Sequence, residues 1–221
     1  MKGLRTVAFL YMIFLLTTIS GNTVVKPPTL ASAKENSLKV EQNTGSQEES
    51  AEEADPSIVV PDYKPDQSPV KGTEALTPVT IEIPSIHLNA PIQNVGRTKD
   101  GSMGVPDEIN TVGWYGPGYK PGETGNAVLA GHVDGNSKPG AFYFLKEMKK
   151  GDVVIVKGED GEKLEFQVTG IESYTPEDSP LQRIFGYSSQ TNLNLITCTG
   201  TFNRKSGHYE ERLVVYTELV E

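Results

Sequence analysis

The sequence from residue 78 onward is a series of short β-prone runs separated by Gly, Pro, Asn and Asp, and this pattern constrains the fold most. The runs are rich in Val, Ile, Thr, Tyr and Phe, which favour strands. They do not alternate with long helical segments, which argues against a sheet of βαβ units. Many short strands of this kind predict an all-β domain built as a closed or nearly closed barrel. We predict strands over residues 79–83, 88–93, 125–132, 152–157, 163–175, 193–198 and 212–219.

Three segments between these strands carry local signals of their own. GAFYFLKEMKKGD, residues 140–152, has apolar residues at 142, 144, 145 and 148 and then Lys-Lys-Gly, which predicts a helix. SPLQRIFG, residues 179–186, predicts one further short helix. EDGEK, residues 159–163, separates two predicted strands and indicates a hairpin turn. Residues 78–221 are long enough for one barrel core, which we predict as a single domain.

The first 25 residues have the layout of an export signal. Lys2 and Arg5 precede an apolar run over residues 6–20, and its extension to residues 6–25 is long enough to span a bilayer as a helix. The small-residue motif at 31–33 lies far past the run for a cleavage site, which favours a retained single-pass anchor over a cleaved signal peptide. In both cases the rest of the chain lies outside the cytoplasmic membrane. No cysteine follows the apolar run, which excludes lipoprotein anchoring.

Residues 26–77 have the composition of a linker. They are rich in Glu, Ser, Gln, Asn and Pro, and acidic residues outnumber basic ones. Such a segment buries too little apolar surface to offset its conformational entropy, so we expect it to be disordered and extended. The low hydrophobic content of the whole chain, 36%, agrees with a sizeable disordered part. The net charge of −9, with no Lys/Arg cluster outside the N-terminus, argues against a nucleic-acid partner.

The segment NLNLITCTGTF, residues 192–202, contains Cys198, the only cysteine of the chain. A single cysteine in an exported protein cannot form an internal disulfide. It therefore serves in intermolecular pairing, acts as a reactive thiol, or packs in the core as an inert residue. The predicted strand 193–198 ends at Cys198, which leaves the thiol at a barrel rim.

One of the three histidines has a matching position. His132 ends the predicted strand in AVLAGH, whereas His87 and His208 lie in ordinary strand, loop and surface contexts. A cysteine and a histidine at strand ends on one rim would make a nucleophile and a base.

An acyl-transfer site also needs a group that stabilises the oxyanion. Arg212 opens the last predicted strand, and an antiparallel pairing with the strand of Cys198 would bring the two together. A guanidinium is always charged and donates in a fixed fork, which suits that role. Arg204, in the loop between the two strands, competes for the same role.

Three segments, GNAVLAGH (125–132), LNLITCTGTF (193–202) and GHYEERLVVYTEL (207–219), together resemble the sortase family. The N-terminal anchor and the extracellular linker are also similar to those of sortases. The resemblance covers residues 78–221 and implies an eight-stranded sortase β-barrel. The short connection TCTGTFNRKSGHY and the compact segment 176–191 are most similar to class F or class D sortases.

The resemblance also implies roles for individual residues. Cys198 matches the family nucleophile, His132 the family histidine and Arg212 the arginine of the last strand, with Arg204 as the alternative arginine. Three further residues match positions that flank the catalytic pair in the substrate groove: Ala130, Ile196 and Thr197.

The implied activity is that of a cysteine transpeptidase of Gram-positive bacteria. It would cleave an LPxTG-like C-terminal sorting motif through a Cys198 thioester and join the surface protein to an amine of a cell-wall precursor. No cofactor is implied. We assign no metal, because the acidic residues of this region have no spacing typical of a calcium site: Glu159, Asp160, Glu162, Glu172, Glu177 and Asp178.

Three rival interpretations come from other classes of protein. An anchored extracellular binding domain with an inert core cysteine remains the main alternative. A papain-like protease is disfavoured, because there the cysteine precedes the histidine and opens a helix, whereas His132 precedes Cys198 here. A zinc site is disfavoured because one cysteine and three scattered histidines lack paired ligand spacing.

Overall fold

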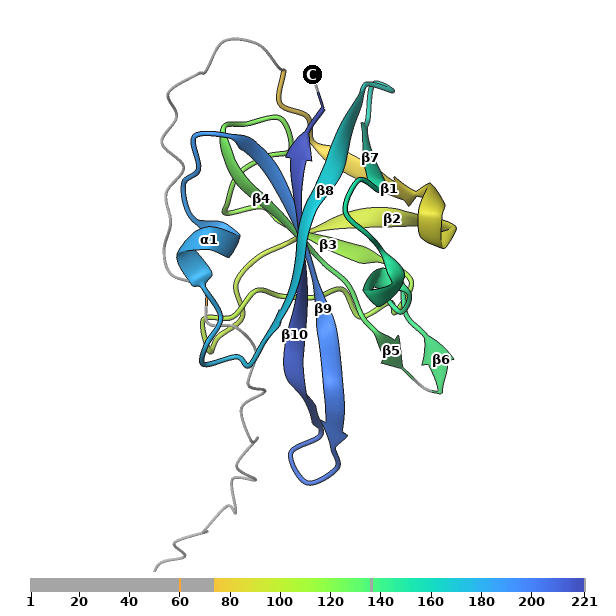
Figure 1. Ribbon diagram of the computed structural model, residues 1–221, viewed down its shortest axis with the longest axis vertical. Coiled ribbons are helices and arrows are strands. Elements are labelled where there is room, and N and C mark those ends of the chain that lie inside the picture. Colours follow the sequence, from red (N-terminus) through yellow and green to blue (C-terminus); the bar gives the residue numbers. More distant parts are fainter. Residues whose placement is uncertain (1–59, 61–73, 136, 221) are drawn as a thin grey trace, which may run out of the picture. The chain divides into compact units, whose positions relative to one another are not determined.

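The computed structural model of the chain describes residues 60, 74–135 and 137–220. Within these residues eight strands form a closed barrel in the order β1-β2-β3-β4-β9-β10-β8-β7, and β7 pairs back to β1 (Figure 1). The predicted all-β, closed eight-stranded barrel is therefore confirmed. The barrel strands are β1 (Pro78–Ile83), β2 (Leu88–Val95), β3 (Val112–Tyr115), β4 (Gly125–Ala130), β7 (Val153–Gly158), β8 (Lys163–Tyr174), β9 (Thr191–Asn203) and β10 (His208–Leu219).

Smaller elements join these strands. A two-stranded hairpin, β5 (Asp134–Gly135) and β6 (Lys138–Pro139), follows β4. The helices are short: η1 (Pro84–Ile86), η2 (Leu145–Glu147) and α1 (Leu181–Phe185). The predicted helix in SPLQRIFG is thus present as α1, and the predicted turn in EDGEK joins β7 to β8 with Gly161 at φ 85°.

Alternating side chains build the barrel core. Ile81 and Ile83 of β1 and Val154 and Val156 of β7 are fully buried, whereas their neighbours along each strand are less so. This period of two is expected where one face of a strand packs inward and the other meets solvent. Strand β4 differs, because all six of its residues are buried. Its outer face must therefore be covered as well, and helix α1 provides part of that cover.

The sequence did not predict β3 or two of the strand pairings. Strand β3 contains only four residues, all buried, so it shows no alternation that would mark it as a strand. It runs parallel to β2, and β4 runs parallel to β9, while the other barrel neighbours are antiparallel. Strands β2 and β3 are joined by a long connection without a helix, whereas two further barrel strands and α1 lie between β4 and β9 in the chain, so neither pair is a βαβ unit.

The predicted helix over residues 140–152 is wrong. The segment forms turns and the short 3₁₀ helix η2, and the backbone hydrogen bonds within it span three residues, as from Leu145 N to Phe142 O and from Met148 N to Leu145 O. Phe142, Leu145 and Met148 are buried at a spacing of three, whereas Phe144 is 44% exposed. A spacing of three matches the three residues per turn of a 3₁₀ arrangement. The apolar pattern is real, but the wrong helical period was inferred from it.

Most of the N-terminal predictions fall outside the described residues. Among the described residues no helix is long and apolar enough to cross a bilayer, and the predicted span, residues 6–25, is not among them. Two described positions of the predicted linker do pack on the barrel. Val60 and Leu76 are buried, and their amides donate to Gly101 O at 2.9 Å and Pro121 O at 3.0 Å. At these two positions the chain is therefore not a solvated linker.

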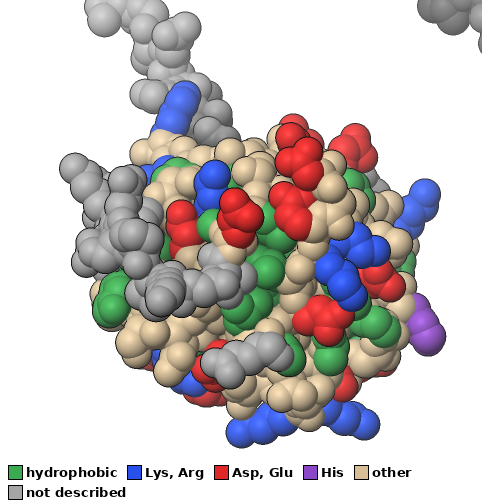
Figure 2. Space-filling view, turned by 90° about the horizontal axis from the view of Figure 1, so that it is seen from above, with side chains coloured by type: hydrophobic (Ala, Val, Ile, Leu, Met, Phe, Trp, Pro, Cys, Tyr) green, Lys and Arg blue, Asp and Glu red, His purple; other side chains and the backbone are tan. Residues whose placement is uncertain are grey.

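Charged side chains are mixed on the face of the described region shown in Figure 2. There Lys and Arg side chains lie among Asp and Glu side chains and are not gathered into a broad basic patch. Nucleic-acid backbones bind to surfaces where positive charge is concentrated. This face therefore offers no such surface.

Candidate active site

Cys198 lies within strand β9 and does not end it. The prediction that the strand stops at Cys198 is wrong, because β9 continues to Asn203 and stays paired with β10 as far as His208 (Figure 1). Leu193 and Leu195 of β9 pack in the barrel core. Because side chains alternate along a strand, Cys198 shares the opposite, outer face with Ile196. Its side chain is partly exposed there.

A β-bulge follows the cysteine directly. Tyr209 pairs with Phe202 and Glu211 with Thr199, so β9 has one more residue than β10 in this interval. Gly200 lies inside the bulge at φ 80°, a conformation that glycine adopts without strain. The segment TGT, residues 199–201, therefore does not end the strand but forms a bulge within it. Bulges of this kind re-aim side chains and often lie beside active sites.

Arg212 is the direct cross-strand neighbour of Cys198 in the β9–β10 ladder. Opposed residues on adjacent strands project on the same face, so the guanidinium and the thiol share the outer face. Arg212 is only 6% exposed, and its Nη1 donates to Tyr209 O at 2.8 Å and to Glu211 O at 3.1 Å. These two carbonyls fix the guanidinium, which lines the groove beside the thiol.

Arg204 occupies a different place. It lies in the exposed turn between β9 and β10, beyond the bulge, and it does not line either of the two cavities described below that contain Cys198. The structure therefore brings Arg212, and not Arg204, together with the cysteine.

His132 follows the end of β4 by two residues. The predicted strand 125–132 is thus too long, since β4 ends at Ala130. The connection is nevertheless well fixed: Gly131 N donates to Ile196 O at 3.1 Å, and Thr197 Oγ1 donates to Gly131 O at 2.8 Å. These bonds tie the histidine segment to β9, the strand that carries the cysteine.

The ring of His132 has one recorded hydrogen bond. Its Nε2 lies 2.7 Å from Pro106 O, and since a carbonyl only accepts, Nε2 carries a proton. In the neutral ring Nδ1 is then the nitrogen without a proton. The backbone beside the ring is close-packed, because a Cβ at Gly140 would lie 2.4 Å from His132 O. Only glycine fits at position 140, so this contact fixes the backbone of the histidine.

The three predicted catalytic residues line one groove. Its volume is about 90 Å³, and its lining is mainly apolar. The three residues predicted to bind substrate lie in the same groove, which is lined by Met103, Val105, Ala130, Gly131, His132, Phe185, Ile196, Thr197, Cys198 and Arg212. Thr197 differs from the other two, because its hydroxyl is already used in the bond to Gly131.

Sequence reasoning missed three apolar residues of this groove: Met103, Val105 and Phe185. Met103 and Val105 belong to the long connection between β2 and β3, and Phe185 is the last residue of α1. No local motif marks them. The apolar end of SPLQRIFG was the available signal for Phe185, since Ile-Phe at the end of a short helix indicates that this end packs against the barrel.

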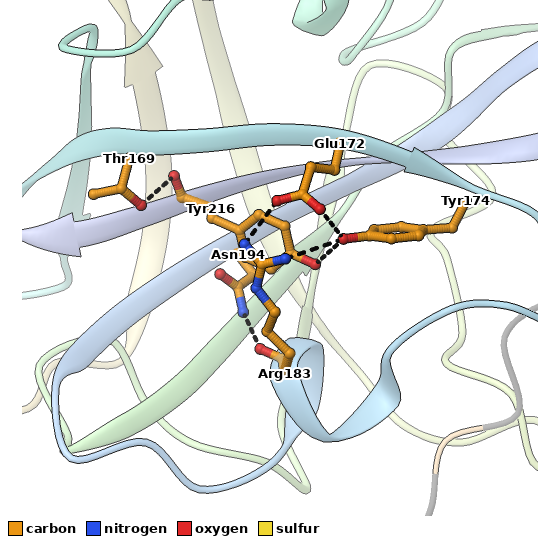
Figure 3. A network of polar contacts seen from close by, with 6 residues as sticks. All are labelled: Thr169, Glu172, Tyr174, Arg183, Asn194 and Tyr216. Carbon is orange, nitrogen blue, oxygen red and sulfur yellow. Dashed lines mark hydrogen bonds and ion pairs between the residues drawn. The ribbon is translucent and has the colours of Figure 1, made fainter.

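A polar network outside the groove holds α1 in place (Figure 3). Arg183 forms an ion pair with Glu172 at 2.8 Å, and its guanidinium lies 3.9 Å from the centre of the Tyr216 ring. Asn194 Nδ2 donates to Ile184 O at 2.8 Å. Phe185, next along the helix, packs edge-on against Tyr115 with ring centroids 5.8 Å apart. Barrel strands β8, β9 and β10 thus position the helix that contributes Phe185 to the groove.

The same network shifts the pKa values of its ionisable groups, including Glu172 and Tyr216. The hydrogen bond from Arg183, with a second from Tyr174, lowers the pKa of Glu172 below its ordinary value. Burial raises the pKa of Tyr216, with a contribution from its hydrogen bond to Tyr174. Glu172 is one of the acids considered for a calcium site, and here its partner is an arginine. No three His, Cys, Asp or Glu side chains of the described residues gather closely enough to hold a metal ion.

The other two histidines lie elsewhere. His87 is exposed and caps η1 at φ 54°, and His208 opens β10 opposite Asn203. Neither lines the apolar groove that contains Cys198.

A thiol, an imidazole and a guanidinium that line one apolar groove have the composition of a cysteine acyl-transfer site. The family model of the sortase domain matches residues 81–220. The chain therefore belongs to the sortase family, whose members are cysteine transpeptidases. The family inferred from the three sequence segments is confirmed, while class F or class D stays a prediction.

Solved structures of sortases share the fold. Sortase A from Corynebacterium diphtheriae is 24% identical with a TM-score of 0.51, and the match covers 67% of this chain and 62% of that one. Sortase C1 from Streptococcus agalactiae is 24% identical with a TM-score of 0.52, over 65% of this chain and 67% of that one. The chain thus spans less than two thirds of the Corynebacterium protein. At such identity these likenesses show the fold alone. No curated protein matches the sequence.

Proposed function

We propose that the protein cleaves a C-terminal sorting motif of exported proteins and transfers the new carboxyl end to an amine. The observation that carries this proposal is the cross-strand pairing of Cys198 with buried Arg212 in a groove that His132 also lines. A structural cysteine would not need a buried cation as its neighbour. We also propose that residues 6–25 direct export of the domain and remain as a single-pass membrane anchor.

The first half of the reaction forms a thioester. The Cys198 thiolate attacks the carbonyl carbon of the scissile bond, and Arg212 with backbone N–H groups stabilises the oxyanion of the tetrahedral intermediate. The His132 imidazolium gives its proton to the leaving amine, the C–N bond breaks, and the acyl group stays on Sγ. A thiol is largely protonated at neutral pH. The neutral thiol–imidazole pair is therefore the more populated form, and the thiolate–imidazolium pair is the reactive form.

The second half releases the product. An amine of a cell-wall precursor attacks the thioester carbonyl, the C–S bond breaks, and the electron pair returns to Sγ. His132, now neutral, accepts the proton that the amine nitrogen loses. Water can replace the amine, in which case the enzyme acts as a hydrolase.

The groove supports a motif of the LPxTG type. Met103, Val105 and Phe185 surround a small apolar space next to Cys198, which suits an aliphatic side chain upstream of the scissile bond. Ala130 and Ile196 form its floor on the outer face of β4 and β9, whose parallel register pairs them directly.

A peptide library read by mass spectrometry tests the proposal. The full chain should cleave LPxTG-like peptides after the threonine and form a thioester on Cys198, and the Cys198→Ala variant should do neither. A methanethiosulfonate probe adds a second readout, because rapid labelling of the native protein indicates a reactive thiol. Protection of Cys198 until denaturation, with no cleavage of any peptide, would indicate the alternative binding domain.

A further inference from the structure

Cys198 lies between two cavities of opposite character. One is the apolar groove described above. The other has a volume of about 240 Å³ and a mainly polar lining, and it shares only Thr197 and Cys198 with the groove. Four other lining residues matter for its chemistry: Asp134, Tyr143, Lys146 and Tyr209.

Acyl transfer at Cys198 needs two binding regions, one on each side of the sulfur. A peptide bond that is attacked by Sγ has an acyl part and an amine part, and these must extend in different directions from the sulfur. The apolar groove takes the acyl part of the sorting motif under the proposed function. The polar cavity is then left for the amine part, which includes the amine that later attacks the thioester.

Asp134 is the acid of this polar cavity. It opens β5, two residues after His132, and its carboxylate is exposed. One oxygen, Oδ2, accepts a hydrogen bond of 2.6 Å from the hydroxyl of Tyr209. Within the described residues Asp134 takes part in no ion pair, so its negative charge is not neutralised by a neighbouring cation.

Tyr209 holds this carboxylate from the opposite side. Its ring packs against Phe202 with centroids 5.2 Å apart, and the two residues are cross-strand partners beside the bulge. The hydrogen bond to Asp134 raises the pKa of Tyr209 to about 12. The phenol therefore stays neutral at physiological pH and fixes the carboxylate without cancelling its charge.

Lys146 is the one cation that lines the polar cavity. Its ammonium lies 5.2 Å from the centre of the Tyr143 ring, whose face attracts it. The ammonium of Lys146 thus interacts with an aromatic ring. Among the described residues, Lys146 forms no salt bridge with Asp134.

We propose that the polar cavity binds the acceptor amine as an ammonium ion, that Asp134 is its specificity-determining residue, and that Tyr209 positions Asp134. This inference rests on the proposed function. The bound ammonium loses one proton to solvent, and the resulting amine attacks the thioester carbon. The C–S bond breaks with its electron pair left on Sγ, and His132 accepts the second proton. The cavity thereby favours cationic amines over water and over neutral nucleophiles.

The test measures how the thioester divides between transfer and hydrolysis. The full chain is given an LPxTG-type peptide with 1,5-diaminopentane, a cationic acceptor, or with hydroxylamine, which is mostly uncharged at neutral pH. Asp134→Asn keeps the shape and the acceptor for Tyr209 but removes the charge. We expect it to lower the transfer-to-hydrolysis ratio for 1,5-diaminopentane about threefold to tenfold through KM, with little change for hydroxylamine.

Two further variants make the test specific. Tyr209→Phe should give a smaller loss in the same direction, because the carboxylate keeps its charge but loses its positioning bond. Asp160→Asn, in the exposed turn between β7 and β8, removes an acid elsewhere and should leave the ratio unchanged.

An unchanged ratio in Asp134→Asn, or an equal loss for both acceptors, would overturn the inference and leave the proposed function standing. Failure of the unaltered protein to cleave any peptide would instead overturn the proposed function, and the inference with it.

Discussion

The two halves of strand β9 differ in what surrounds them. From Asn192 to Ile196 the strand lies between β4 and β10, and its inward side chains, Leu193 and Leu195, are fully buried. From Thr199 to Asn203 it pairs with β10 alone and is largely exposed (Figure 1). Cys198 lies where one half meets the other. The barrel half thus fixes the thiol, while the projecting half keeps its surroundings open.

Removal of the thiol should give the largest effect. Cys198→Ala should abolish peptide cleavage, because the groove has no second thiol and the Thr197 hydroxyl is held by Gly131 O. It should leave the melting temperature almost unchanged, because the side chain of Cys198 is partly exposed. Cleavage kinetics and a thermal melt of the same preparation check both points. Residual cleavage at the rate of the unaltered protein would remove Cys198 from the mechanism.

Replacement of the arginine in each region should affect kcat very differently. Arg212→Ala should lower kcat by about 100- to 1,000-fold, as expected for loss of one oxyanion donor. Arg204→Ala, in the exposed turn, is the matched control and should cleave normally. Because Arg212 is buried, a melt must show that its variant is folded. Loss of activity in Arg204→Ala with retention in Arg212→Ala would reverse the assignment.

Truncation of a side chain should lower the free energy of unfolding much more in the barrel half than in the projecting half. Leu195→Ala, in the barrel half, should lower the free energy of unfolding by about 2–5 kcal/mol, because it removes a fully buried side chain. Phe202→Ala, in the projecting half, should cost much less, since that ring is 47% exposed. Denaturant titrations of both variants give the comparison. Equal losses would show that the hairpin is as integral to the barrel as the core is.

The bulge between the two halves should tolerate little change. Gly200→Ala places a side chain at φ 80° and a Cβ 3.2 Å from Glu211 Cγ, so we expect a loss of about 1–2 kcal/mol. The bulge re-aims Cys198, so kcat should fall as well. Thr201→Ala, one residue further, is the control and should leave kcat unchanged. Normal kinetics in Gly200→Ala would show that the bulge does not orient the thiol.

The ion pair that holds α1 should give the smallest effect. Glu172 has a lowered pKa, so its contribution to stability is present above its ordinary value of 4.5 and is lost as pH falls through the lowered pKa. Because the pair is exposed, Glu172→Gln should cost less than about 1 kcal/mol at neutral pH. It should also flatten stability against pH in the acid range and raise KM for peptide, since Phe185 is less well held. If stability depended on pH in the variant as it does in the unaltered protein, the Arg183–Glu172 ion pair would not contribute to it.

Much of the fold followed from local patterns. Alternating residues marked β1, β7 and β8 because each has one solvated face, and the hairpin glycine at 161 marked the turn between the last two. Strand β3 and the 3₁₀ segment were not recognised, because a four-residue buried strand shows no alternation and a spacing of three resembles a helix. The end of β9 was misplaced because TGT is typical of turns, and only its pairing with β10 shows that Gly200 forms a bulge.

The candidate site was predictable in its residue types but not in its surroundings. Cys198 and His132 follow apolar strand residues, and an antiparallel pairing predicted Arg212. Met103, Val105 and Phe185 come from a long loop and a short helix, so tertiary contacts alone bring them to the groove. The Tyr209–Asp134 bond joins residues 75 apart in sequence and depends on the projecting hairpin.

The central claim is that Cys198 carries the acyl group. Intact-mass spectrometry of the protein mixed with an LPxTG-type peptide, quenched in acid, tests it directly. The account predicts an adduct with the mass of the peptide through its threonine, located on Cys198, removed by hydroxylamine and absent from Cys198→Ala. Peptide cleavage without any adduct on Cys198, or an adduct that persists in Cys198→Ala, would contradict it.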